Sequence, residues 1–162
     1  MKVLLILKHL EYIKEIKGGY YMLANGIKLG YCTSGSSYTN LEGLQEVPEI
    51  GSEPEKVDVT TLADKAKKYE QGIGDYGDLD FTFKYDNSSE TSPFRILKGF
   101  EANKTVVKFQ MEFPDGTKFK WDAQVSVKIG GGGVNALITF TVSMALQSEV
   151  DTEDPSDPLQ AK

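Results

Sequence analysis

Cysteine is almost absent from this sequence, because Cys32 is the only one among 162 residues. A single cysteine excludes an internal disulfide and any zinc site built from several cysteines. Histidine is equally scarce, since His9 is the only one and lies close to the N-terminus. Cys32 therefore has no histidine near it in the sequence to act as a base, and we expect a structural or merely exposed thiol.

Positive charge and long apolar runs are also in short supply. The 18 Lys and Arg residues face 24 Asp and Glu, which gives a net charge of −6 and a pI of about 4.9. Such a chain has no surplus of cations with which to bind nucleic acid through its phosphates. No apolar run approaches the ~20 residues that a membrane span requires, so we expect no membrane partner. The length suits one domain with a substantial core.

The first 21 residues have three interpretations. The apolar run after Met1 is interrupted by Lys8 and His9, and no small-residue cleavage site follows it, which argues against a signal peptide. A short amphipathic helix is the second interpretation. The third is that residues 17–22, Lys-Gly-Gly-Tyr-Tyr-Met, are encoded by a ribosome-binding sequence and a start codon. We favour the third, in which residues 1–21 are a translated leader and the native protein begins at Met22.

Alternation of apolar and polar residues, the period of a half-buried strand, dominates the rest of the chain. A shorter strand is expected at 27–31, and another at 41–50, where Pro48 confines it to an edge or an end. Two of the alternating runs are far longer than the usual ~5–6 residues and suit a large hairpin. We therefore predict a mainly β fold, an antiparallel sandwich or barrel. The alternating runs cover residues 56–60, 79–85, 107–113, 119–129 and 134–146.

One short flanking helix is predicted from Pro93 to Ala102. Ser92 can accept hydrogen bonds from the N–H groups of the first turn, and proline at the first helical position loses none. Phe94, Leu97 and Phe100 fall on one face, so we expect this helix to pack on the sheet.

Residues 61–78 separate two predicted strands by far more than a hairpin needs. The loop contains no catalytic set, so contact with another protein is the expected function, and a solvated loop face is the alternative. Positive charge here would complement another copy of this acidic chain, and tyrosines are favoured in interfaces. The side chains concerned are Lys65, Lys67, Lys68, Tyr69 and Tyr76.

Other candidate sites lack the partners that their chemistry needs. Gly130 to Gly133 precede a predicted strand rather than a helix, so a hairpin connection is favoured over a phosphate site. Asp75, Asp78 and Asp80 do not have the spacing of an EF-hand, and we expect no metal and no cofactor. Residues 148–162 are rich in acidic residues and contain Pro155 and Pro158, which predicts a flexible acidic tail after a domain at 22–147.

Several motifs, taken in order, resemble the tail tube proteins of long-tailed, non-contractile phages. The resemblance covers roughly Met22 to Asp151. The motifs are Val57 to Asp64, Lys68-Tyr69, Gly72-Ile73, Asp75, Gly77, Leu79 to Asp86, Trp121 to Val127 and Gly133 to Ser143.

The resemblance implies a structural virion protein rather than an enzyme. Six β-sandwich subunits would form a ring, and rings would stack into a hollow tube through which the genome passes without specific binding. The implied partners are further copies of the chain, a tape measure protein, a tail terminator and tail tip proteins. The implied location is the virion tail, after assembly in the host cytoplasm.

The resemblance also suggests roles for particular residues. The loop at 61–78 would reach the neighbouring ring. Alternation predicts that Asp122 and Gln124 face the lumen, although bulk solvent is the alternative. Two other functions remain open, a monomeric β-sandwich module that binds carbohydrate and the tube protein of a contractile injection system. The expected inter-ring residues are Leu62, Asp64, Lys65, Lys67, Lys68, Tyr69, Asp75 and Tyr76.

Overall fold

The structure is a computed structural model that describes residues 22–155, so the expected leader lies outside the described residues. It is mainly β, as predicted, with one helix in the part described, α2 (Pro93–Asn103). The strands are β1 (Lys28–Cys32), β2 (Thr39–Leu41), β3 (Leu44–Glu46), β4 (Lys56–Asp58), β5 (Tyr69–Gln71), β6 (Asp78–Lys84), β7 (Val107–Glu112), β8 (Lys118–Ile129), β9 (Thr139–Leu146) and β10 (Asp151–Glu153).

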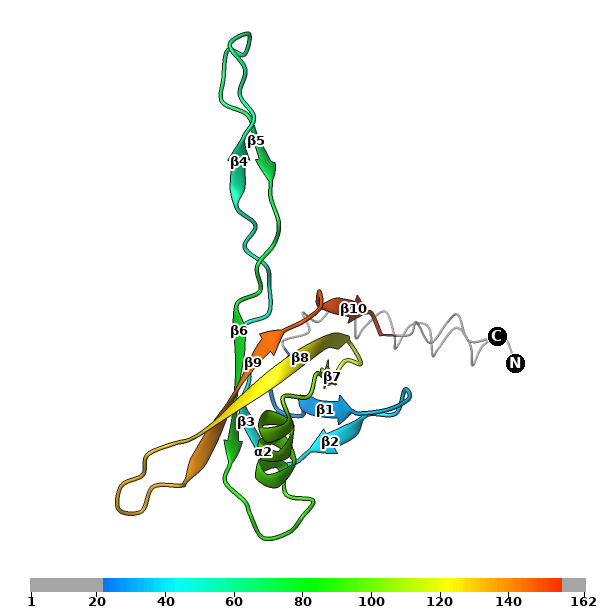
Figure 1. Ribbon diagram of the computed structural model, residues 1–162, viewed down its shortest axis with the longest axis vertical. Coiled ribbons are helices and arrows are strands. Elements are labelled where there is room, and N and C mark those ends of the chain that lie inside the picture. Colours follow the sequence, from blue (N-terminus) through cyan, green and yellow to red (C-terminus); the bar gives the residue numbers. More distant parts are fainter. Residues whose placement is uncertain (1–21, 156–162) are drawn as a thin grey trace, which may run out of the picture.

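One antiparallel sheet forms the body, in the order β2-β1-β7-β8-β9-β6-β3, and β10 pairs with β8. The chain passes from β2 at one edge to β3 at the other through only Glu42 and Gly43. Gly43 has a φ of 82°, a conformation that favours glycine. Such a short link between the two edges requires the sheet to curve round on itself, as in a sandwich or barrel (Figure 1).

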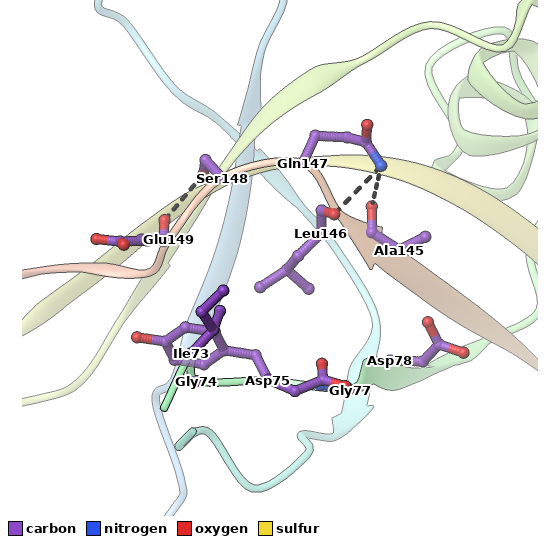
Figure 2. Close-up of a pocket in the computed structure, with 11 residues that line it drawn as sticks. Ile73, Gly74, Asp75, Gly77, Asp78, Ala145, Leu146, Gln147, Ser148 and Glu149 are labelled. Carbon is purple, nitrogen blue, oxygen red and sulfur yellow. Dashed lines mark hydrogen bonds between the residues drawn. The ribbon is translucent and has the colours of Figure 1, made fainter. Parts of the chain in front are cut away.

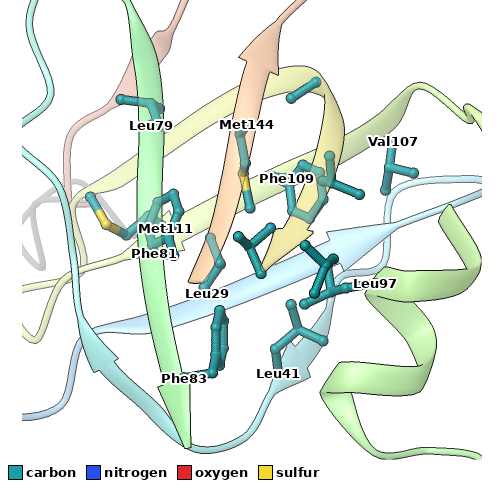
Figure 3. Close-up of a cluster of buried hydrophobic side chains, with 14 of the residues drawn as sticks. Leu29, Leu41, Leu79, Phe81, Phe83, Leu97, Val107, Phe109, Met111 and Met144 are labelled. Atoms are coloured by element: carbon teal, nitrogen blue, oxygen red, sulfur yellow. The ribbon is translucent and has the colours of Figure 1, made fainter. Parts of the chain in front are cut away.

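The core lies inside this curved sheet and is built from one face of each long strand (Figure 3). Phe83 stacks on Phe140 with ring centroids 5.3 Å apart, and Phe81 stacks on Trp121 at 6.0 Å. These rings come from β6, β8 and β9, so the aromatic pairs join strands that are distant in sequence. The alternation read from the sequence therefore identifies the buried face of β6, β7, β8 and β9 correctly.

Helix α2 packs on the sheet through the face predicted from its spacing. Leu97 is fully buried, Phe94 contacts the ring of Phe140 and Phe100 contacts that of Tyr31. The expected capping by Ser92 is wrong, because its side chain makes no cap hydrogen bond. Its hydroxyl instead donates to Asp86 at 3.3 Å, which ties the helix start to the preceding loop.

Helix α2 also covers part of an open strand edge. β7 pairs with β8 only as far as Ala123, so the following residues of β8 have no strand on that side. The Glu101 carboxylate accepts a hydrogen bond from the Val127 N–H at 3.1 Å and forms an ion pair with Lys98. These two contacts, with the Lys98 ammonium the larger influence, lower the pKa of Glu101 from its ordinary 4.5.

Replacing Glu101 should remove this contribution in a pH-dependent way. A depressed carboxyl pKa in the folded state adds stability above the unfolded-state pKa of about 4.5, and this stability is lost as pH falls through the folded-state pKa. We expect Glu101→Gln to lower the free energy of unfolding by about 1 kcal/mol at pH 7. The difference from the unchanged protein should shrink below pH ~4.5.

Urea denaturation at pH 7 and pH 3 measures this difference. Glu90→Gln, which changes an exposed glutamate in the loop before α2, serves as the control. Equal losses for Glu101→Gln at both pH values would contradict the assignment.

The early and late strand predictions require correction. The strand expected at 41–50 is two short strands, the end of β2 and β3, because the turn at Gly43 divides it. The strand expected at 134–146 begins only at Thr139, since β8 ends at Ile129 and offers no partner for residues 134–138. Those residues instead belong to the loop that joins β8 to β9, which is longer than the connection predicted at Gly130 to Gly133.

The acidic tail is also partly ordered. β10 pairs with the start of β8, with Asp151 opposite Lys120 and Glu153 opposite Lys118. Glu153 forms ion pairs with both Lys118 and Lys120. The sequence predicted a flexible tail from residue 148 onward, whereas pairing with basic residues of β8 holds residues 151–153 in a strand. Residues 156–162 lie outside the described part.

Candidate functional site

A long two-stranded hairpin, residues 51–77, leaves the body at one end and is called the arm below (Figure 1). β4 pairs with β5 in antiparallel register, with Lys56 opposite Gln71 and Asp58 opposite Tyr69. Outside these strands, the Gly72 N–H donates to Glu55 O at 2.7 Å and the Glu53 N–H to Asp75 O at 3.1 Å. Backbone hydrogen bonds thus connect the two sides of the arm from its tip to its base.

The arm corrects the sequence prediction in two ways. The strand expected at 56–60 pairs within the arm, and the loop expected at 61–78 contains β5. The alternation predicted a half-buried strand, yet every residue of β4 is exposed. The physical reason is that the arm projects away from the sheet, so neither face has a layer to cover it.

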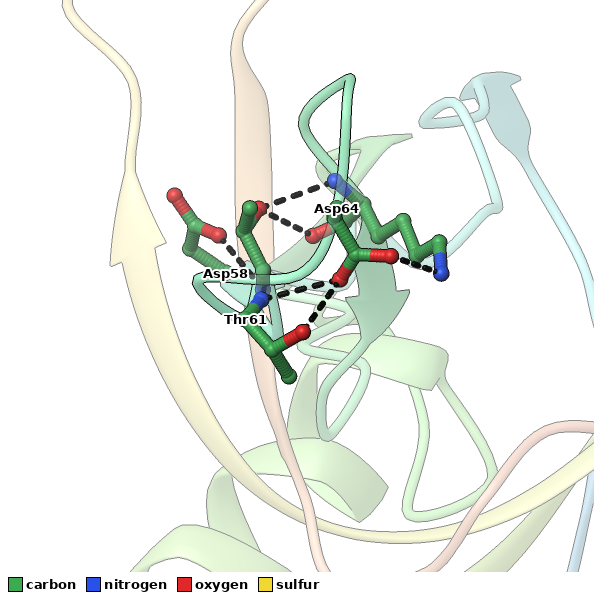
Figure 4. A network of polar contacts seen from close by, with 5 residues as sticks. Asp58, Thr61 and Asp64 are labelled. Carbon is green, nitrogen blue, oxygen red and sulfur yellow. Dashed lines mark hydrogen bonds and ion pairs between the residues drawn. The ribbon is translucent and has the colours of Figure 1, made fainter.

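Asp64 organises the tip of the arm (Figure 4). Its carboxylate accepts hydrogen bonds from the Thr61 N–H and hydroxyl, both at 2.9 Å, and forms an ion pair with Lys68. Thr60 joins the two sides, because its hydroxyl accepts from the Lys68 N–H at 2.9 Å. These contacts give the tip a defined conformation although most of its residues are exposed to solvent.

The basic cluster of the tip is largely neutralised within the arm itself. Lys68 pairs with Asp64, and Lys67 lies 3.5 Å from the Asp58 carboxylate. The Lys68 ammonium is the main cause of a lowered pKa at Asp64, while hydrogen bonds from Thr60 lower the pKa of Asp58 most. Only Lys65 of the three lysines forms no ion pair among the described residues. Positive charge is therefore less available for docking than the sequence indicated.

Apolar side chains are the more prominent feature of the arm. Leu62 at the tip is fully exposed, and Ile73 near the base is 93% exposed. Val57, Val59 and Tyr69 are also exposed, although Lys67 lies 6.0 Å from the centre of the Tyr69 ring. The exposure of Ile73 and of the two valines was missed from the sequence. The mostly polar residues at 52–56 and 60–71, on either side of Val57 and Val59, were the signal that could have revealed this exposure.

The base of the arm and the end of β9 line an open hollow (Figure 2). Leu146 points into the hollow from β9, and Ile73 lines the wall of the hollow that the arm forms. Asp75 and Glu149 also line it, and the Asp75 carboxylate accepts from the Gly77 N–H at 2.9 Å. The Asp75 side chain thus stabilises a turn at the base of the arm.

Within residues 22–155, no three His, Cys, Asp or Glu side chains are arranged to hold a metal ion. No helix of the described part is long and apolar enough to cross a membrane. Cys32 is buried, and its thiol donates to Ser34 O at 3.3 Å.

The eight expected contact residues fall into two groups on the arm. The structure brings Leu62, Asp64, Lys65, Lys67, Lys68 and Tyr69 together at or beside the tip. Asp75 and Tyr76 lie at the base, where they line the hollow.

The two expected lumen residues lie on the outer face of β8, opposite the core. The cross-strand row Asp80, Ser143 and Ser126 belongs to this polar face, and the Ser143 hydroxyl donates to Asp80 at 2.5 Å. Gln124 is held near the strand edge, because its side-chain amide donates to Lys104 O at 3.1 Å. This face carries charges of both signs, namely Asp78, Asp80, Glu112 and Asp122 with Lys84, Lys108, Lys118, Lys120 and Lys128.

Solved structures with a similar fold come from a gene transfer agent, a contractile injection system and an anti-feeding prophage. The tail of an empty gene transfer agent particle, refined with helical C6 symmetry, aligns with a TM-score of 0.63 at 20% identity, over 81% of this chain and 99% of the other. A sheath-tube complex of an extracellular contractile injection system gives 0.65 at 8% identity, over 87% and 97%. The six-fold symmetrised baseplate of an anti-feeding prophage gives 0.64 at 9%, over 86% and 99%.

None of the curated protein sequences matches this chain. The sequence model of one family does match, and it is described as the phage tail tube protein. The match extends over residues 19–153, which include the whole curved sheet, α2 and the arm. This family is structural rather than enzymatic, and its members are components of the virion tail. The chain therefore belongs to the phage tail tube protein family.

Proposed function

We propose that the chain forms six-membered rings which stack into a hollow tail tube, and that the phage genome leaves through this tube. The observation that carries the proposal is the arm, a hydrogen-bonded hairpin that extends beyond the folded body and exposes apolar side chains. A monomeric protein gains nothing from such an element, whereas a subunit of a stack can bury it against a neighbour. The six-fold symmetry of the similar tail structure supports the ring size.

The arm is proposed to contact the adjacent ring. Its tip offers Leu62 to a neighbour, while Asp64, Lys67 and Lys68 maintain its shape through ion pairs inside the arm. Lys65 and Tyr69 are available for direct contact, and Asp75 and Tyr76 are proposed to shape the base. The eight residues therefore divide into contact residues and residues that hold the arm in position.

The polar face of β6, β9 and β8 is proposed to line the lumen. Asp122 and Gln124 lie on this face, and exposed polar side chains are suited to a water-filled channel. The presence of both signs of charge on this face supports a lumen without specific affinity for DNA, rather than a uniformly acidic one. The tape measure protein, tail terminator and tail tip proteins are proposed as further partners, with assembly in the host cytoplasm.

Two other functions have some support. The similarity to contractile injection systems favours the tube of a contractile tail as the second candidate, because both kinds of tube share this fold. A carbohydrate-binding module has less support. Aromatic platforms for sugars need exposed rings, and the only aromatic among the strongly exposed large apolar residues described is Tyr69.

Negative-stain electron microscopy of concentrated protein tests the proposal. We expect rings with six-fold symmetry and tubes of stacked rings, whose amount rises with protein concentration because assembly follows mass action. A sedimentation measurement across the same range provides the independent control. A monomer at every concentration would overturn the proposed function.

A further inference from the structure

Exposed apolar side chains gather at two opposite ends of the folded molecule. Of the twelve strongly exposed large apolar residues in the described part, nine lie either on the arm or beside the loop that joins β8 to β9. The first group, called the arm patch, is Val57, Val59, Leu62, Tyr69 and Ile73. The second, called the loop patch, is Ile129, Val134, Leu137 and Ile138.

The two patches face away from each other along the molecule. The arm leaves the body at the top of Figure 1, and the β8–β9 loop lies at the bottom. Both patches are exposed to water in a monomer, which is unfavourable for apolar side chains. Contact with another copy in an assembly would bury them. In a stack whose subunits all point the same way, one end of each subunit meets the opposite end of the next.

The loop patch is built to present its side chains outward. Glycines occupy residues 130–133, and a turn follows in which the Ala136 N–H donates to Gly133 O at 3.1 Å. Asn135 has a φ of 63°, so the chain reverses there. Val134 is 95% exposed and Leu137 53% exposed on the two sides of this reversal. The glycines add no side chains that would cover the patch.

Two of the three lysines near the tip of the arm are not free to bind a partner. Lys67 and Lys68 are already paired with Asp58 and Asp64, so their charges are satisfied within the arm. Besides its remaining charged side chains, the arm presents the five exposed apolar side chains of the arm patch to a partner. An apolar surface is best matched by another apolar surface, and within the described residues the loop patch is the one at the opposite end of the molecule.

We propose that the arm patch of one copy docks on the loop patch of a copy in the next ring. The contact is head-to-tail, so each copy donates an arm at one end and receives an arm at the other, which allows the stack to continue without limit. This inference rests on the proposed function and adds to it the receiving surface. Its partner is a second copy of this chain.

Photo-crosslinking in assembled tubes tests the contact directly. A photoreactive amino acid replaces Val134, and this protein is mixed with a ¹⁵N-labelled unmodified copy before assembly. We expect crosslinks from position 134 to residues 51–77 of a labelled copy, identified by mass spectrometry. The same photoreactive residue at Ser36, in the exposed β1–β2 loop, is the control and should not label the arm.

A pair of matched variants measures the energetic contribution. Val134→Ser with Leu137→Ser changes only exposed loop side chains and should raise the protein concentration needed for tubes at least tenfold, with isolated rings remaining. Val106→Ser changes an apolar side chain that is 48% exposed but belongs to neither patch, and it should leave stacking unchanged.

The possible outcomes distinguish the two proposals. Tubes in which position 134 labels a different surface of the next copy, or only its own ring, would overturn this inference and leave the proposed function intact. Unchanged stacking of the loop double variant would do the same. An unmodified protein that never forms tubes would overturn the proposed function and this inference with it.

Discussion

Shortening the arm is expected to abolish tube formation and leave the subunit folded. Replacing residues 60–67 with Asn-Gly joins Val59 to Lys68, which already form a backbone hydrogen bond of 3.0 Å, and Asn-Gly suits a two-residue hairpin turn. The change removes Leu62 and the Asp64 network, and with them the reach of the arm. We expect the protein concentration needed for tubes to rise by more than tenfold, measured by negative-stain microscopy and sedimentation.

The folded body should not be affected by this change. Every residue of β4 and β5 is exposed, and the arm contributes no residue to the buried core. The thermal unfolding midpoint should therefore stay within the error of measurement. Leu62→Ser keeps the full arm length and separates the effect of reach from that of the apolar tip. Normal tubes assembled from the shortened protein would show that the arm has no part in stacking.

Truncating Trp121 is expected to have the largest effect on stability. The side chain is 2% exposed and lies between Phe81 and Phe109, with ring centroids at 6.0 and 6.4 Å. Trp121→Ala would leave a cavity between three strands, and such changes cost about 3–5 kcal/mol in the free energy of unfolding. Because Trp121 is the only tryptophan, the variant loses the tryptophan fluorescence signal. Unfolding in urea should therefore be followed by circular dichroism.

The conservative variant Trp121→Phe separates packing from hydrogen bonding. The buried Nε1 of Trp121 has no hydrogen-bond partner in the described structure, so phenylalanine removes a polar group that is not satisfied. We expect this variant to lose much less than the alanine variant and to remain able to assemble. A loss as large as that of Trp121→Ala would mean that Nε1 makes an important bond.

The body of the protein was largely predictable because burial there is periodic. Phe81 and Phe83 alternate with Asp80 and Thr82, and a strand with one face on a core must show this period. Helix α2 was predictable for a similar reason, since Phe94, Leu97 and Phe100 mark one face. The cap at Ser92 was not, because a hydroxyl has several possible partners and the sequence does not rank Asp86 above the helix N–H groups.

The arm shows where periodicity fails. Val57 and Val59 alternate as in a covered strand, but no layer covers them. Whether an alternating strand is buried depends on what lies across from it, and that partner is distant in the sequence. Residues 134–138 illustrate the same limit, because their alternation continues although β8 has ended and cannot pair with them.

The sequence by itself determined the fold class, the core faces of the long strands, the short helix α2 and, through its motifs, the family. Each of these is encoded locally, in the period of apolar residues or in the order of short motifs. Only the tertiary structure decided that residues 51–77 form a projecting hairpin, that Lys67 and Lys68 are neutralised within it, and that two apolar patches lie at opposite ends. These features depend on contacts and distances between segments remote in sequence, which local patterns do not specify.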